Sequence, residues 1–289
     1  MRGILLAGGS GTRLLPLTSV SSKQLLPVYD KPLIYYPLSV LMLAGMREIL
    51  VISDGRHLES FRHLLGDGGR FGLDLRYAAQ DSPRGIAEAL LIGREFAGDE
   101  DVCLILGDNI FYGQGLPATL REAAGTVDGC TVFGYPVSDP ERYGVAALDE
   151  DGRLLDIEEK PAEPRSNLAV TGLYMYSNDA LICAEKISPS ARGELEITDV
   201  NRMLVAEGRG RLVRLGRGTA WLDAGTHDSL LEASQYVQVL QKRQGLRIAC
   251  LEETAYHMGY IGKEQLRALA DGLSAGSDYG RHVRSLLRT

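Results

Sequence analysis

The sequence predicts an α/β fold with a Rossmann-like, mixed but mostly parallel sheet that is flanked by helices. Strand and helix patterns alternate through the first half of the chain, and its strands are apolar runs without polar alternation. Such strands are typical of a parallel sheet covered on both faces. A glycine-rich turn follows the first of them. The 289 residues leave room for one large domain or two modest ones.

The elements follow one another in a regular order. In the first half we expect strands at 4–7, 48–53, 73–79 and 102–106, and helices at 32–44, 58–65 and 85–96. Pro32 suits the start of the first helix and Gly45 its end. In the second half we expect strands at 131–137, 144–148, 154–158 and 170–176, with a hairpin turn at 150–152. Helices are expected at 197–207 and at 226–241, where Thr226 suits the N-cap.

The tail from 246 to 289 has a helical pattern with glycine breaks. We therefore expect one continuous body over residues 1–243 and a C-terminal helical appendage over 244–289. The formal net charge of −7, without a Lys/Arg cluster, argues against a nucleic-acid partner. No apolar segment approaches the ~18 residues of a membrane span, and the chain starts directly in a strand rather than a signal peptide.

The four cysteines are scattered and form no Cys-x-x-Cys pair. This pattern favours buried free thiols over a disulfide framework or a zinc site. Free thiols are typical of a reducing compartment, so a cytoplasmic location is expected.

The turn after the first strand, Ala7-Gly8-Gly9-Ser10-Gly11-Thr12-Arg13-Leu14, is suited to an anion. Glycines let the backbone approach a ligand closely, and successive N–H groups form a nest for anions. Arg13 and, further on, Lys23 add charges suited to a polyphosphate. The turn is not a Walker loop, because no Lys-Ser/Thr pair follows its glycines. It is not a dinucleotide fingerprint either, because Leu14 stands where the third glycine would be. For the glycines alone, a connector without a ligand remains an alternative.

Two carboxylates end apolar runs elsewhere in the chain. Asp108 follows the strand at 102–106, and ligands of open α/β sheets bind beyond the carboxyl ends of strands. A carboxylate beside a phosphate loop suits Mg²⁺. Asp223 repeats the pattern and could complete a metal site or only cap the following helix. A third run, Glu158-Glu159-Lys160, either reaches the same ligand or is a solvated charge run.

Together these motifs resemble the sugar-nucleotide pyrophosphorylases, most closely the glucose-1-phosphate thymidylyltransferases. The likeness covers nearly the whole chain and is most specific at 6–14, 22–32, 106–109, 158–161 and 192–199. It implies the nucleotidyltransferase fold and an Mg²⁺-assisted reaction. The phosphate oxygen of glucose 1-phosphate attacks the α-phosphorus of dTTP, and dTDP-glucose and pyrophosphate form without a covalent enzyme intermediate.

The resemblance also implies roles for the charged residues. Arg13 and Lys23 would hold the triphosphate and the leaving group. Lys160 and Arg192 would hold the sugar phosphate, and Asp108 and Asp223 would carry the metal. The catalytic residues would then be Arg13, Lys23, Asp108 and Lys160. The implied nucleotide site consists of Leu6, Gly8, Gly9, Gly11, Thr12, Arg13, Lys23, Gln24, Gln80, Gly85 and Asp108.

The base and the sugar would meet different parts of this site. Gln80 and the backbone near Gly85 would read the base, with Leu6 and Ile86 packing against it. Relatives more often carry Leu at position 86 and Gln at position 88, where this chain has Ile and Glu. Trp221 could wall the pocket. The implied sugar-phosphate site consists of Asn109, Tyr143, Gly144, Glu159, Lys160, Val170, Tyr174 and Arg192.

Oligomer contacts and regulation follow from the same resemblance. The long helix after Asp223 and the C-terminal helices would join a homotetramer. Arg217 and Glu253 resemble residues of a second, regulatory nucleotide site, although Pro117 stands where some relatives have His.

Other readings remain open. The same chemistry could use UTP or another sugar 1-phosphate. A non-catalytic, ligand-sensing subunit would be expected to have lost the phosphate cations or the metal carboxylates, which this chain keeps. A dinucleotide-dependent oxidoreductase would need a glycine in place of Leu14.

Overall fold

A computed structural model describes residues 1–9 and 11–288 of the chain. Within these residues, nine strands form one central sheet. Seven of them lie in the order β10 (Leu154–Glu159), β9 (Gly144–Leu148), β11 (Leu168–Tyr176), β6 (Val102–Leu106), β1 (Arg2–Leu6), β4 (Glu48–Ser53) and β5 (Asp74–Ala79). The other two are β8 (Cys130–Pro136), which pairs with β11, and β12 (Gly210–Arg214), which pairs with β8.

The sheet is mixed, with a parallel core. β1 runs parallel to both β4 and β6, and β5 runs parallel to β4. β11 is antiparallel to its neighbours β6, β8 and β9. All nine residues of β11 are buried, because strands or side chains cover it on every side. The predicted α/β class with a mixed, mostly parallel sheet is confirmed.

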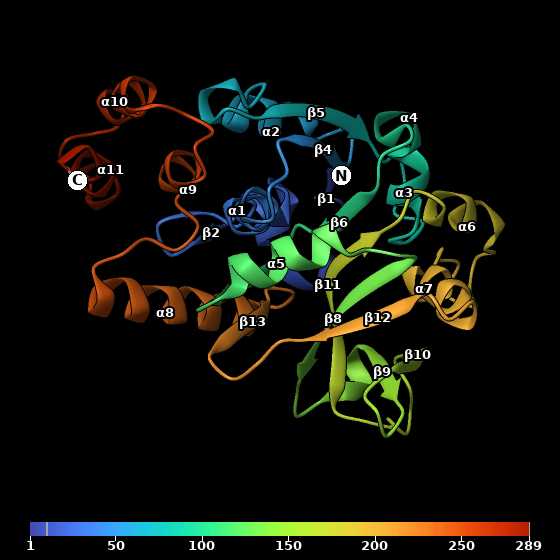
Figure 1. Cartoon of the computed structure of the whole chain (residues 1–289). Helices are drawn as coiled ribbons and strands as arrows, with labels where there is room; N and C mark the ends of the chain where they lie inside the picture. The colour runs from blue at the N-terminus through green and yellow to red at the C-terminus, as the bar shows by residue number, and fades with distance from the viewer. Residues whose placement is uncertain (10, 289) are drawn as a thin grey trace.

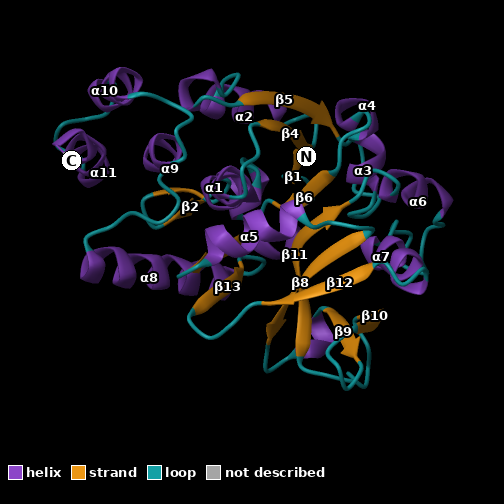
Figure 2. Cartoon of the chain, viewed as in Figure 1, coloured by secondary structure: helices purple, strands orange, loops and turns teal. Residues whose placement is uncertain are grey.

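Helices cover both faces of this sheet (Figures 1 and 2). One face packs on α1 (Tyr35–Leu43), α2 (Leu58–Leu65), α5 (Leu116–Gly125) and α9 (Leu251–His257). The other face packs on α3 (Glu88–Ile92), α4 (Arg94–Ala97), α6 (Ala180–Lys186) and α7 (Ile197–Ala206). α1 is apolar around nearly its whole circumference, as expected for a helix enclosed by the core.

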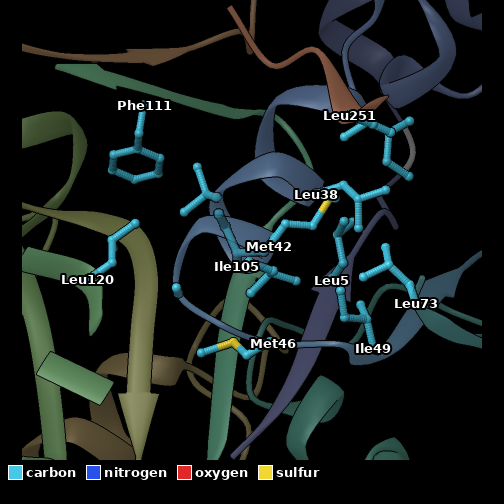
Figure 3. Close-up of a cluster of buried hydrophobic side chains, with 14 of the residues drawn as sticks. Leu5, Leu38, Met42, Met46, Ile49, Leu73, Ile105, Phe111, Leu120 and Leu251 are labelled. Carbon is cyan, nitrogen blue, oxygen red and sulfur yellow. The ribbon is translucent and has the colours of Figure 1, made fainter. Parts of the chain in front are cut away.

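Figure 3 shows the first of these two cores. Leu5 and Ile105 project from neighbouring strands toward Leu38 and Met42 of α1, and Leu251 of α9 closes the cluster. The C-terminal helices therefore pack onto the main body through the same core that holds α1. The division at residues 243 and 244 stays a prediction.

Beyond the sheet, α8 (His227–Gln244) begins with a capping box, in which Thr226 and Ser229 each bond the other's backbone N–H. It packs over the short hairpin of β2 (Pro27–Val28) and β3 (Lys31–Pro32). α9 follows, and then α10 (Lys263–Asp271) and α11 (Asp278–Ser285), which lie at the far end from β9 and β10 (Figure 1). No helix among the described residues combines the length and the apolar character needed to cross a membrane.

Two expected helices are shorter than the sequence suggests. The one expected from Pro32 begins at Tyr35, because Pro32 pairs with Pro27 in the β2–β3 hairpin. The one expected over 85–96 begins at Glu88 and breaks at Gly93, where an added Cβ would lie 2.6 Å from Ile4 Cδ1. Elements with no counterpart in the prediction are the helices α5 and α6 and the strands β2, β3, β12, β7 (Asn109–Gly113) and β13 (Thr219–Asp223).

Candidate active site

A cavity of about 400 Å³ opens beyond the carboxyl ends of β1, β5 and β6. Its size is that of a small-molecule site. It brings together segments from the first glycine turn to β13. Of the residues singled out in the sequence, it is lined by Leu6, Gly8, Gly9, Arg13, Lys23, Gln24, Gln80, Gly85, Ile86, Asp108, Asn109, Tyr143, Gly144, Glu159, Lys160, Val170, Tyr174, Trp221 and Asp223.

The glycine turn shapes one side of this cavity. Gly9 and Gly11 have φ values of +103° and +59°, a region that side chains rarely adopt. The chain then forms a short 3₁₀ helix, Thr12–Leu14, from which the exposed Arg13 extends. Gly11 and Thr12 were expected to bind the nucleotide, but they do not line the cavity.

Gln24 braces this turn instead of offering a free amide. Its Nε2 donates to Gly8 O at 3.1 Å, and its Oε1 accepts from Ser22 Oγ at 2.6 Å. The residue lines the cavity as expected, but its polar atoms hold the backbone of the turn in place.

The two carboxylates meet through a small antiparallel ladder. β7 pairs with β13 so that Asn109 lies opposite Asp223, and Ala224 N donates to Asp108 O at 3.0 Å. Asp108 forms an ion pair with Lys23 and accepts from Asn109 Nδ2 at 2.9 Å. The β7–β13 ladder, whose two strands were not predicted from the sequence, therefore positions both predicted metal ligands.

Opposite effects act on the pKa values of these carboxyl groups. Burial alone would raise the pKa of Asp108, but the charge and hydrogen bond of Lys23 hold it below its ordinary range. The pKa of Asp223 is raised to about 6, first by burial and then by the negative charge of Asp108. Among the described residues, no side chain forms an ion pair or hydrogen bond with the Asp223 carboxylate. This under-compensated pair of oxygen donors fits a hard divalent cation.

Across the cavity, Glu159 is held by neighbouring polar groups. Thr198 Oγ1 donates to its Oε2 at 2.7 Å, and Arg192 Nη2 lies 3.4 Å from its Oε1. Lys160 follows with a φ of +45° and its backbone N–H donates to Tyr143 O at 3.0 Å. That conformation turns the chain at the end of β10, so both neighbouring side chains line the cavity.

Arg192 differs from the expectation. It does not line the cavity, because its guanidinium holds both carboxylate oxygens of Glu196 at 2.9 Å. It stands at the rim, joined to the site through Glu159.

Asn109 and Trp221 form one wall of the cavity. Asn109 Oδ1 accepts from Trp221 Nε1 at 2.6 Å and from Gly172 N at 3.0 Å. The ring of Tyr143 meets Trp221 edge-on, with centroids 5.1 Å apart. The oxygen of Asn109 is thus used within the protein, and its amide nitrogen already donates one hydrogen to Asp108. Only the second N–H of that nitrogen is left for a ligand.

Some cavity residues were not foreseen. Arg142, whose pKa is raised chiefly by its hydrogen bond to Asp139, adds a cation that also lowers the pKa of nearby Asp223. Arg142 directly precedes Tyr143 in the sequence, and this adjacency to a predicted site residue was the one signal that could have indicated it. The others are Pro83, Leu106, Gly172, Glu194, Glu196 and Ile197.

The suspected regulatory residues lie elsewhere. Arg217 is exposed in the turn between β12 and β13, and neither it nor Glu253 lines the cavity. Glu253 Oε2 lies 2.8 Å from His282 Nε2, which links α9 to α11. Their regulatory role stays a prediction.

The fold and the site define a class of protein. Residues 2–239 match the sequence profile of the family described as "Nucleotidyl transferase", so the chain belongs to that family. A Neisseria meningitidis glucose-1-phosphate thymidylyltransferase is 56% identical over 100% of both chains. A relative of the same name from Mycolicibacterium smegmatis is 52% identical over 99% of each chain. Within its family, this chain therefore belongs with the glucose-1-phosphate thymidylyltransferases.

Solved structures agree with this placement. A crystal structure assigned as a glucose-1-phosphate thymidylyltransferase from Bacillus anthracis, in complex with sucrose, superposes with a TM-score of 0.76 at 40% identity. It covers 82% of this chain and 94% of that one. A UDP-glucose pyrophosphorylase complexed with UDP-glucose gives 0.73 at 26% identity, covering 82% of this chain and 98% of that one.

Proposed function

We propose that this protein joins dTTP and glucose 1-phosphate to form dTDP-glucose and pyrophosphate, by direct attack of the sugar phosphate on the α-phosphorus. The observation that carries the proposal is one cavity that holds a glycine turn with Arg13 and Lys23, the Asp108–Asp223 pair, and Glu159 with Lys160. No serine, cysteine or histidine of the described chain lines that cavity. The cavity therefore lacks the serine–histidine and cysteine–histidine pairs that commonly form covalent enzyme intermediates.

Charge is the main obstacle to this reaction. The substrates bring several negative charges together, and two unit charges 4 Å apart repel by about 4 kcal/mol at an effective dielectric near 20. Arg13, Lys23, Lys160 and Arg142 all line the cavity and offset this repulsion. Asp108 and Asp223 would hold Mg²⁺, which supplies charge neutralisation and polarises phosphoryl oxygens when bound.

The remaining residues bind and orient the substrates. The N–H groups of the glycine turn would hold the triphosphate, with the leaving pyrophosphate on the side of Arg13 and Lys23. The Glu159 carboxylate, already fixed by Thr198, would accept bonds from sugar hydroxyls. Lys160 would hold the sugar phosphate with its oxygen aimed at the α-phosphorus.

A second candidate is the same reaction with UTP. The similarity to a UDP-glucose pyrophosphorylase structure favours considering it. Thymine differs from uracil by one methyl group, and burying such a group is worth only ~0.8 kcal/mol. Some turnover of UTP is therefore expected.

The test is release of pyrophosphate by the purified protein with Mg²⁺. Four nucleoside triphosphates are each combined with glucose 1-phosphate and with other sugar 1-phosphates. The proposal expects the highest kcat/KM for dTTP with glucose 1-phosphate, and loss of turnover in EDTA. Absence of pyrophosphate release with dTTP, or turnover that is indifferent to EDTA, would contradict it.

We also propose a homotetramer in the cytoplasm. Leu231 and Val239 of α8 are each 57% exposed, which supports α8 as a contact surface. All four cysteines are free, in keeping with a reducing compartment. Light scattering on a sizing column gives the mass, and a monomeric mass at working concentration would contradict the oligomer.

A further inference from the structure

A second group of metal-binding side chains lies outside the active-site cavity, where α9 meets α11. It consists of Cys250, Glu253 and His282. The cysteine sulfur, a carboxylate oxygen and an imidazole nitrogen all lie within 4.8 Å of one another. None of these three residues lines the cavity, so the carboxylate pair of the active site and this cluster are separate.

Two helices hold the three side chains together. Cys250 is the N-cap of α9 and Glu253 is the third residue of that helix, two positions whose side chains come close at a helix start. His282 belongs to α11, and its Nε2 lies 2.8 Å from Glu253 Oε2. Cys250 is 1% exposed, whereas the side chains of Glu253 and His282 are 22% and 13% exposed. The cluster is therefore closed at the sulfur and reachable from the other two ligands.

The donor atoms indicate which cation would bind. Sulfur, imidazole nitrogen and carboxylate oxygen are the three ligand types of zinc, whereas Mg²⁺ prefers oxygen alone. Three atoms within 4.8 Å of one another fit in a circle of about 2.8 Å radius, and zinc bonds such atoms at about 2.0–2.3 Å. A small contraction of the cluster would thus bring all three atoms to bonding distance.

The charges of such a site balance. Burial and the charge of Glu252 raise the pKa of the Cys250 thiol, so the thiol stays protonated while no cation is near. A bound Zn²⁺ deprotonates a coordinating thiol, and the proton passes to the buffer. The thiolate and the Glu253 carboxylate then cancel the two charges of the ion, and a neutral imidazole adds none.

The neighbouring carboxylate tolerates the loss of that proton. Cys250 Sγ donates to Glu252 Oε2 at 3.5 Å, and the hydroxyl of Tyr279 donates to the same oxygen at 2.5 Å. Glu252 therefore keeps its shorter hydrogen bond when the thiol ionises.

We propose that Cys250, Glu253 and His282 form a binding site for Zn²⁺, with water in the fourth position. The ion joins α11 to the start of α9, next to Leu251 in the core that also holds α1. It occupies the Glu253 carboxylate that the family resemblance assigns to a regulatory nucleotide site. The sequence pattern favoured free thiols, because it has no Cys-x-x-Cys pair and His282 follows Glu253 only 29 residues later.

Cobalt binding to the full chain tests this site. The protein is stripped with EDTA, kept reduced with a phosphine, freed of chelator and titrated with Co²⁺ in excess Mg²⁺. A thiolate ligand gives Co²⁺ a strong charge-transfer absorption, which the sulfur-free pair Asp108 and Asp223 cannot produce. We expect this absorption to saturate at a single Co²⁺ per chain and to disappear when Zn²⁺ displaces the cobalt.

Two variants each remove one ligand. Cys250→Ala should lose the charge-transfer absorption, and His282→Gln should bind Zn²⁺ at least about tenfold more weakly in competition with a coloured chelator. Cys183→Ala and His63→Gln are the matched controls, at a buried cysteine of α6 and an exposed histidine of α2, and should bind as the wild type does. If Cys250→Ala does not fold, the less buried His282→Gln still decides.

Thermal unfolding gives an independent reading of the same site. Zn²⁺ should raise the Tm of the wild type and both controls, because the ion binds the folded state, and should not raise that of the two ligand variants. Absence of the thiolate absorption, or unchanged Zn²⁺ affinity in His282→Gln, overturns the proposal and leaves Glu253 and His282 as an ion pair alone. These measurements use the metal without substrate, so their outcome is independent of the proposed nucleotidyl transfer.

Discussion

Asp223 lies directly opposite Asn109 in the β7–β13 ladder, and this pairing puts its carboxylate beside that of Asp108. The two carboxylates come from segments more than a hundred residues apart. Lys23 pairs with Asp108 but not with Asp223, so the two groups experience different charges. This asymmetry leads to the first two predictions.

Removing either carboxylate should abolish turnover. Asp108→Asn and Asp223→Asn each take one oxygen ligand from the expected Mg²⁺ site and should lower kcat/KM by roughly 10²-fold or more. Asp228→Asn, at an exposed position in the first turn of α8, should leave it unchanged. Pyrophosphate release measures all three, and Asp223→Asn with near-normal turnover would remove that residue from the site.

The same Asp223→Asn variant should be more stable than the wild type in EDTA. In the wild type, the pKa of the Asp223 carboxyl group is near 3.8 in the unfolded chain and about 6 in the folded one. The native state therefore holds an extra proton in that window, and its stability falls as the pH rises through it. Above pH 6 the cost is complete, on the order of 1–3 kcal/mol.

Urea unfolding at pH 8 and at pH 4.5 checks this sign. The advantage of Asp223→Asn over the wild type should be largest at pH 8 and should shrink at pH 4.5. An advantage that grows on acidification would show that burial and Asp108 do not raise this pKa.

Glu159→Gln should weaken sugar-phosphate binding selectively. The carboxylate loses its charge, and hydrogen bonds to charged groups contribute about 1.5–3 kcal/mol each. We expect the KM of glucose 1-phosphate to rise roughly tenfold or more, with that of dTTP within about twofold. Glu158→Gln is the matched control, since the neighbouring side chain on β10 is exposed and points to the other face. Equal effects on both substrates would contradict the assignment.

Trp221→Phe should cost stability through one hydrogen bond. The indole N–H donates to Asn109 Oδ1 at 2.6 Å in a buried site, and its loss should lower the free energy of unfolding by about 1–2 kcal/mol. Tyr135→Phe keeps the ring that meets Trp221 edge-on and serves as control. Urea denaturation gives both values, and equal stabilities would show that this bond has no net effect.

Much of the fold could be predicted from local patterns. The bounds expected at 48–53, 102–106 and 144–148 coincide with β4, β6 and β9, because each is an apolar run between clear turn signals. β7 and β13 escaped prediction because they pair only with each other, and the partner of each strand is remote in the sequence. No local pattern encodes such a pairing.

The candidate site shows the same limit. Residue types at strand ends indicated Asp108, Asp223 and Glu159, and the cavity brings all three together. The sequence does not reveal that Glu196 holds Arg192 at the rim, or that Trp221 occupies the oxygen of Asn109. Both depend on side-chain competition among elements that only the folded chain brings into contact.

The most direct measurement of the central claim is the stereochemical course at the α-phosphorus. A single diastereomer of dTTP with sulfur on the α-phosphate is turned over with glucose 1-phosphate, and the configuration of the product is read by phosphorus NMR. Direct attack by the sugar phosphate predicts dTDP-glucose with inverted configuration. Retention would require an intermediate on the enzyme and would contradict the account, as would the absence of the sugar nucleotide.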